Sequence, residues 1–122
     1  MLSGSFYTIQ FLEQSPGTVT ATIVFNEAHP IFKGHFPSIP VVPGVCMMQL
    51  VKETLEQTIG YKTRLTHADN LKFLNLITPT QTLSVTLKMN YARQEDQYDI
   101  QAELTNGRQS FFKFKGNFDK EV

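Results

Sequence analysis

The chain is poor in cysteine, has no excess charge of either sign and contains no long apolar run. Cys46 is its single cysteine, so an internal disulfide is impossible. Eleven basic residues balance eleven acidic ones and do not gather into a basic stretch, which argues against nucleic-acid binding. Residues 1–5 lack the basic segment and apolar run of a signal peptide. We therefore expect a cytoplasmic protein with no membrane span.

The length of the chain limits its organisation. Its 122 residues, of which 41% are hydrophobic, are enough to bury one core. They leave no room for a separate substrate domain, and the sequence shows no linker or internal repeat. We expect a single domain over residues 1–122, whose function comes from its own surface or from a dimer.

Most of the chain has the pattern of β-strands. Apolar residues alternate with polar or β-branched ones, and turn residues such as Ser15-Pro16-Gly17 and Asn106-Gly107 separate the runs. These patterns predict strands at residues 6–12, 18–25, 64–77, 82–91, 97–104 and 110–118. The first two should form a hairpin and the last four an antiparallel meander.

One helix is predicted, at residues 45–59. This segment contains no glycine or proline, and Gly60 follows it as a stop signal. Apolar residues recur in it every three or four positions, at Val45, Met48, Val51, Leu55 and Ile59. Its first turns are apolar nearly all round, which is typical of a helix surrounded by protein. The predicted fold is α+β, an antiparallel sheet of about six strands wrapped around one central helix.

His35 stands in a rigid run just before this helix. Pro37, Pro40 and Pro43 each fix a backbone angle, so the loop holds its side chains in place. Gly44 follows at the helix start, where no Ser, Thr, Asp or Asn caps the first backbone N–H groups. A titratable imidazole beside free N–H donors indicates a site.

The same run matches the pattern F-x-G-H-F-P-x-x-P-V-x-P-G-V followed by a helix. The matching residues are Phe32, Gly34, His35, Phe36, Pro37, Pro40, Val41, Pro43, Gly44 and Val45. Through them the chain resembles the 3-hydroxyacyl-[acyl-carrier-protein] dehydratases of fatty acid synthesis, which are hotdog-fold enzymes. The resemblance implies a homodimer, or a higher even oligomer, whose sheets join side by side with acyl-thioester tunnels at the subunit interface.

The resemblance also implies catalytic roles. His35 would take the proton from C2 of a 3-hydroxyacyl thioester, and the N–H of Gly44 would stabilise the enolate-like oxygen. The family's acid, which protonates the departing hydroxyl, is replaced here by Gln49, whose amide releases no proton near pH 7. Glu53 lies one turn further and could supply that proton. Alternatively, its carboxylate is solvated on the outer face of the helix.

The remaining expectations concern ligands and partners. Candidate acyl-binding residues, which could equally belong to the core, are Phe32, Phe36, Val45 and Phe73. We expect no metal, and no cofactor beyond the phosphopantetheine of a carrier protein or the coenzyme A that holds the substrate. Acyl carrier protein is the expected partner. Candidate residues for docking it are Lys33, Lys62, Arg64 and Lys72.

The expected function is dehydration of 3-hydroxyacyl thioesters to trans-2-enoyl thioesters in fatty acid, polyene or related lipid biosynthesis. Two alternatives remain open on the same fold. One is an acyl-thioester hydrolase, and the other is a non-catalytic acyl-thioester binder or heterodimer partner.

Overall fold

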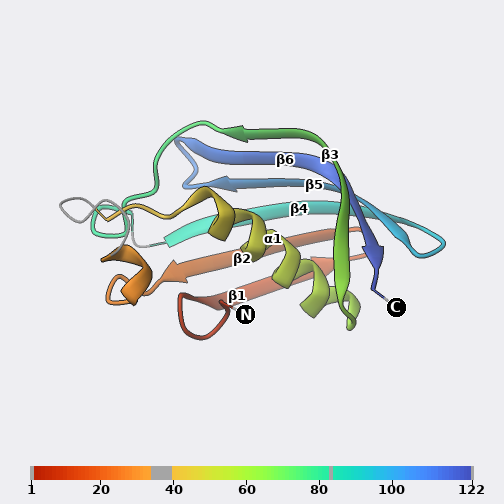
Figure 1. The fold of residues 1–122 in the computed structure, drawn as a ribbon, viewed down its shortest axis with the longest axis horizontal. Coiled ribbons are helices and arrows are strands. Elements are labelled where there is room, and N and C mark those ends of the chain that lie inside the picture. Colours follow the sequence, from red (N-terminus) through yellow and green to blue (C-terminus); the bar gives the residue numbers. More distant parts are fainter. Residues whose placement is uncertain (1, 34–39, 83, 122) are drawn as a thin grey trace.

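The computed structural model describes residues 2–33, 40–82 and 84–121. In this part of the chain a six-stranded antiparallel sheet curves around one α-helix, as Figure 1 shows. The elements are β1 (Tyr7–Ser15), β2 (Thr18–Phe25), the short 3₁₀ helix η1 (Pro30–Phe32), α1 (Gly44–Ile59), β3 (Thr63–Phe73), β4 (Ser84–Gln94), β5 (Gln97–Thr105) and β6 (Ser110–Lys120). The predicted sheet around a central helix is confirmed.

The strands follow from period-two alternation. In β2, β4, β5 and β6 buried side chains alternate with exposed or half-buried ones, because one face of the sheet packs on α1 and the other meets solvent. The predicted hairpin of β1 and β2 is present, with Ser15 paired to Thr18 across Pro16 and Gly17. Gly17 has a φ of 81°, which glycine adopts without strain.

The order of strands is β1-β2-β4-β5-β6-β3. The predicted four-strand meander is wrong at its first strand, because β3 lies at the far edge beside β6 instead of beside β4. The physical reason is the path of α1, which follows β2, crosses the concave face and delivers the chain to the opposite edge (Figure 1). Strand β4 then takes the place beside β2.

The predicted strand at residues 64–77 is also too long at its end. β3 stops at Phe73, and the backbone N–H groups of Leu74 and Asn75 donate to the carbonyl of Phe111. The carbonyl of Ile77 instead accepts from the N–H of Val42, in the segment that leads into α1. Residues 74–77 therefore connect the sheet edge to the helix start.

Helix α1 begins at Gly44 and ends at Ile59, close to the predicted bounds. Gly60 ends it with a φ of 88° and donates its N–H to the carbonyl of Glu56. The helix buries an apolar face, as predicted, but it also buries Glu53 and Thr54. Thr54 is satisfied within the helix, since its hydroxyl donates to the carbonyl of Leu50 at 2.9 Å.

Large apolar side chains are exposed along one border of the molecule. They lie on β3, on the segment after it and at the start of α1: Leu65, Leu71, Phe73, Leu74, Leu76 and Val45. β3 is an edge strand that pairs only with β6 in the described chain. Among the described residues, no helix has the length and hydropathy needed to cross a membrane.

Candidate active site at the start of the helix

An open hollow of about 360 Å³ lies at the start of α1. Its walls come from the lead-in to the helix, from the first turns of α1 and from the end of β3 with the segment that follows. They are mostly apolar, and the lining residues are Val41, Val42, Pro43, Gly44, Met47, Phe73, Leu74, Asn75 and Leu76. A hollow of this character suits an acyl chain.

Gly44 and Phe73 meet in this hollow. A Cβ atom added to Gly44 would lie 2.7 Å from Cζ of Phe73, so the aromatic ring rests on the helix start and glycine leaves it room. The Phe73 ring also stacks on Phe112 at 5.2 Å between centroids. Phe73 is 53% exposed, so about half of its side chain stays accessible. The candidate binding residue Phe73 is thus brought to the helix start.

The helix start offers backbone donors. Pro43 stands at the N-cap and makes no side-chain cap bond, while the N–H of Cys46 donates to the carbonyl of Pro43 at 3.0 Å. The N–H groups of Gly44 and Val45 have no acceptor among the described residues. With the positive end of the helix dipole, they can stabilise an anionic oxygen. Val45 is 76% exposed beside them.

Two of the predicted site residues, His35 and Phe36, lie outside the described residues. Lys33 and Pro40 are the described residues on either side of that run. The predicted binding residue Phe32 belongs to the core, because it is buried and stacks on Phe6 at 5.0 Å. Phe32 does not line the hollow.

Glu53 is bound by four donors. Its Oε2 accepts from the N–H of Leu2 at 2.8 Å and from Nε2 of Gln49 at 2.9 Å. Its Oε1 accepts from the N–H of Ser3 at 2.8 Å and from the hydroxyl of Tyr7 at 3.0 Å. Glu53 is only 5% exposed, so the alternative of a solvated carboxylate is wrong. A buried carboxylate is stable here because each oxygen has two donors.

These contacts set the protonation of both Glu53 and Tyr7. Burial alone would raise the pKa of Glu53, but the hydrogen bonds from Leu2, Gln49, Ser3 and Tyr7 outweigh it and hold the pKa below its ordinary value. Burial and the neighbouring charge of Glu53 raise the pKa of Tyr7 well above its usual range, so the phenol keeps its proton. An ionised Glu53 has no proton to release near pH 7, which argues against its role as the missing acid.

Sequence reasoning missed the partners of Glu53. Tyr7 is 46 positions away along the chain and Leu2 is 51, and no local pattern links them to the helix. Cys46 is buried in the core, and burial raises the pKa of its thiol.

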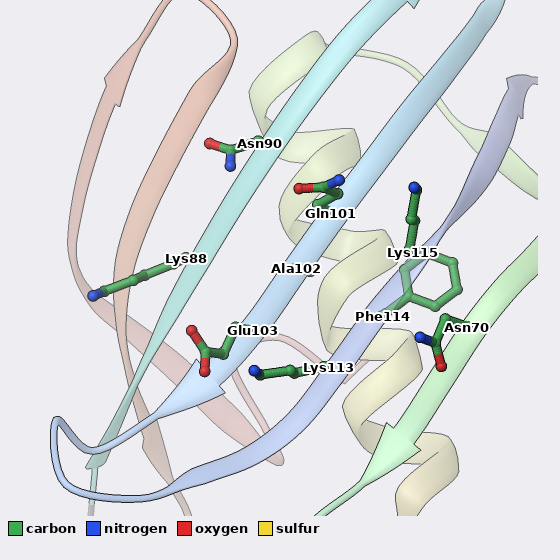
Figure 2. A pocket seen from close by; sticks show the side chains of 9 residues that line it. All are labelled: Asn70, Lys88, Asn90, Gln101, Ala102, Glu103, Lys113, Phe114 and Lys115. Atoms are coloured by element: carbon green, nitrogen blue, oxygen red, sulfur yellow. The ribbon is translucent and has the colours of Figure 1, made fainter.

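A second hollow of about 380 Å³ lies on the outer face of the sheet. Figure 2 shows it lined by side chains from β3, β4, β5 and β6: Asn70, Lys88, Asn90, Gln101, Ala102, Glu103, Lys113, Phe114 and Lys115. None of the predicted catalytic or acyl-binding residues is among them. The sheet separates this polar surface from α1 (Figure 1).

A curled antiparallel sheet around one helix, with an apolar hollow at the start of that helix, defines a hotdog-fold protein. The chain belongs to the ApeI-like dehydratase family, because that family's model, described as ApeI dehydratase, matches residues 12–119. The resemblance to hotdog dehydratases is therefore confirmed.

Curated relatives agree with this family. The chain is 39% identical over 71 residues to the 3-hydroxyacyl-[acyl-carrier-protein] dehydratase FabZ of Wolbachia pipientis wMel, covering 50% of this chain and 46% of the relative. It is 30% identical over 103 residues to FabZ of Caulobacter sp. strain K31, covering 77% and 53%. The chain thus spans about half the length of the curated relatives it matches.

A solved structure supports the fold. The dehydratase heterocomplex ApeI:P from Xenorhabdus doucetiae contains a chain that superposes with a TM-score of 0.75 at 18% sequence identity. The match covers 92% of this chain and 96% of the other.

Proposed function

We propose that this chain is a dehydratase subunit that acts on 3-hydroxyacyl thioesters held by acyl carrier protein and forms trans-2-enoyl thioesters. The observation that supports this most is the apolar hollow at the start of α1, where the N–H groups of Gly44 and Val45 are free among the described residues. An acyl chain fits the hollow, and the thioester oxygen fits the donors.

The proposed reaction uses His35 as the base. His35 takes the proton from C2, the negative charge moves onto the thioester oxygen, and the helix start stabilises it. The C3–O bond then breaks, a double bond forms between C2 and C3, and the hydroxide leaves as water. Because the amide of Gln49 has no proton to release, the hydroxide takes one from solvent, and His35 returns to solvent the proton that it took from C2.

The proposal includes a dimer. β3 is an edge strand with exposed Leu71 and Phe73, and Val45 and Leu76 continue this apolar border. A second hotdog chain that pairs along β3 would cover it and complete the site. Sedimentation should therefore give a dimer for the wild-type chain and a monomer for Leu71→Lys. A monomeric wild-type chain at micromolar concentration would contradict this part.

The test of activity is direct. The purified chain is incubated with 3-hydroxyacyl thioesters of several chain lengths on acyl carrier protein and on coenzyme A, and the products are read by mass spectrometry. We expect 2-enoyl product, faster from the carrier, and none from His35→Ala. Release of free thiol instead would favour a hydrolase, and the absence of both products would overturn dehydration by this chain alone.

A second candidate is a non-catalytic partner subunit. This candidate is favoured by Gln49, which stands at the position of the family's acid, and by Glu53, whose carboxylate is already bound by hydrogen-bond donors. The solved heterocomplex described above is a dehydratase that assembles from two different chains. This candidate predicts that the chain binds 3-hydroxyacyl thioesters without turnover.

We also propose, for the dehydratase, a cytoplasmic location and a role in fatty acid, polyene or related lipid synthesis.

A further inference from the structure

Asn75 brings a polar side chain to the wall of the hollow at the helix start. Among the described residues that line this hollow, the others are glycine, proline or apolar residues. The backbone around Asn75 is fixed, because its N–H and that of Leu74 donate to the carbonyl of Phe111. A single polar side chain in an apolar pocket typically sets the orientation of the ligand, which makes Asn75 a candidate for contact with the substrate.

The direction of the Asn75 amide follows from its partner. Its Nδ2 donates to the backbone carbonyl of Ser110 at 2.8 Å. A carbonyl oxygen only accepts, so the nitrogen of the amide, and not its oxygen, must face Ser110. Oδ1 is therefore turned away from that carbonyl, and no donor among the described residues binds it. Asn75 thus carries an unused hydrogen-bond acceptor.

The hollow has a buried side and an exposed side. Val41, Val42 and Met47 form the buried side. Asn75 and Leu76 are exposed, and they form the rim with the residues next to them. A substrate that is held by a carrier protein enters from the exposed side, because the carrier stays outside. The part of the substrate that passes Asn75 is therefore the part nearest to the carrier.

The two ends of an acyl thioester differ in what they offer to Asn75. An alkyl chain has no donor, so packing it against Oδ1 would leave a polar atom without a partner. The pantetheine arm carries an amide N–H that only an ethylene bridge separates from the sulfur, and this N–H can donate to Oδ1. Gly44 lines the same hollow, so its N–H can hold the thioester oxygen at the same time.

We propose that Asn75 is a binding residue for the pantetheine arm, whose Oδ1 accepts a hydrogen bond from the amide nearest to the thioester. This inference rests on the proposed function and adds the direction in which the substrate lies. The arm leaves past Asn75 at the rim, and the acyl chain points to the buried side at Val42 and Met47. Affinity then depends on a donor in the arm as well as on the acyl chain.

Calorimetry with a matched pair of ligands tests this contact. Both ligands are saturated acyl-pantetheine ketones, in which a methylene group replaces the sulfur, so they can be neither dehydrated nor hydrolysed at the thioester. One keeps the amide nearest to the ketone, and the other has an ester oxygen in place of its N–H. We expect the wild-type chain to bind the amide ligand about tenfold more tightly than the ester ligand.

Variants assign the preference to Asn75. Asn75→Leu should bind the two ligands equally, because it removes the acceptor. Asn75→Ala should do the same and takes its place if the leucine disturbs the fold, which urea unfolding checks. The control Asn90→Leu makes the same change on the outer face of the sheet and should keep the wild-type preference. If Asn75 only ties its segment to β6, its loss would weaken both ligands alike and leave their ratio unchanged.

The outcomes separate this inference from the proposed function. If neither ligand binds, free or attached to acyl carrier protein, the proposed function fails. If both bind and the wild-type chain does not distinguish them, the function stands and the contact with the arm is overturned. A preference that persists in Asn75→Leu and Asn75→Ala would equally overturn it, because another group would then read the amide.

Discussion

At the scale of single residues, Gln49 stands where the resemblance to the dehydratases implies an acidic proton donor. An amide can hold a hydroxyl group but cannot protonate it, so the slow step in the proposed reaction is departure of hydroxide. The structure also shows why Glu53 does not take over, since four donors keep it ionised.

Gln49→Glu should therefore raise dehydration. The new carboxyl would face the ionised Glu53 where Gln49 now lies 2.9 Å from it, and two carboxylates so close share a proton. The shared proton has a raised pKa and can be given to the departing hydroxyl. We expect kcat to rise roughly 10²-fold or more, and the rate to fall as pH rises through that pKa. Steady-state kinetics across pH 5 to about 9 measure both effects.

The matched control is the exchange Gln49→Glu with Glu53→Gln. It keeps an acid at position 49 and removes the second charge, so it should also gain activity. The pKa on the alkaline side of its pH–rate profile should be lower than that of Gln49→Glu alone. If neither variant exceeds the wild-type rate while both fold, loss of the acid does not limit this chain.

Gly44→Ala tests the close contact at the helix start. The added methyl group would meet the Phe73 ring, which is half exposed and can move aside. We expect a modest loss of stability, about 1 kcal/mol or less, but a clear loss of acyl binding, because the displaced ring fills the hollow. Urea unfolding and calorimetry on one sample check the two expectations. If the free energy of acyl binding falls by no more than the free energy of unfolding, Gly44 serves packing alone.

At the scale of elements, Glu53 joins the chain before β1 to the middle of α1. The pKa of Glu53 lies below its ordinary value of 4.5, so its contacts stabilise the fold fully above that value and lose their effect as pH falls through the lower folded-state pKa. The free energy of unfolding should therefore fall as the pH drops below about 4.5 and through the lowered pKa of Glu53.

Glu53→Gln supplies the comparison, because an amide does not titrate. Its free energy of unfolding should be lower than that of the wild-type chain at pH 7 and should fall less on acidification. Chemical unfolding at several pH values measures both curves. Parallel curves would show that Glu53 contributes nothing to acid sensitivity.

The limits of sequence reasoning are visible in these same elements. The strands and α1 could be predicted because period-two and helical patterns are local, and β2 has its predicted bounds. The place of β3 beside β6 could not, because it depends on how α1 crosses the sheet. Gly44 and Phe73 were candidates on their own, but their contact joins two distant segments. The burial of Glu53 depends on Leu2 and Tyr7, which no spacing in the sequence relates to it.

At the scale of the whole molecule, the net charge is zero, but lysines gather on the outer face of the sheet. On the outer face of the sheet, strand register places Lys72 opposite Lys113, then Glu103, then Lys88 in one row across β3, β6, β5 and β4. Figure 2 shows Glu103 and Lys113 on neighbouring strands, with Lys115 further along β6. This lysine row lies beside Phe73, at the same end of β3 as the hollow at the helix start.

Of the docking residues predicted from sequence, Lys72 lies in this row, whereas Lys62 precedes the other end of β3. An acidic carrier protein would be attracted to the row, where three lysines accompany one glutamate and Lys115 lies nearby on β6. Lys88→Glu combined with Lys113→Glu should raise KM for carrier-bound substrate about tenfold or more. It should leave KM for the pantetheine-bound substrate unchanged.

The control for the lysine row is Lys62→Glu, which makes the same type of charge change at the far end of β3. It should leave both KM values as they are. Raising the salt concentration should weaken carrier binding in the wild-type chain more than in the double variant, because salt screens the attraction between exposed charges. Equal KM values for the double variant and Lys62→Glu would place carrier docking elsewhere on the surface. Lys33, which directly precedes the run that holds His35, would then be the next residue to reverse.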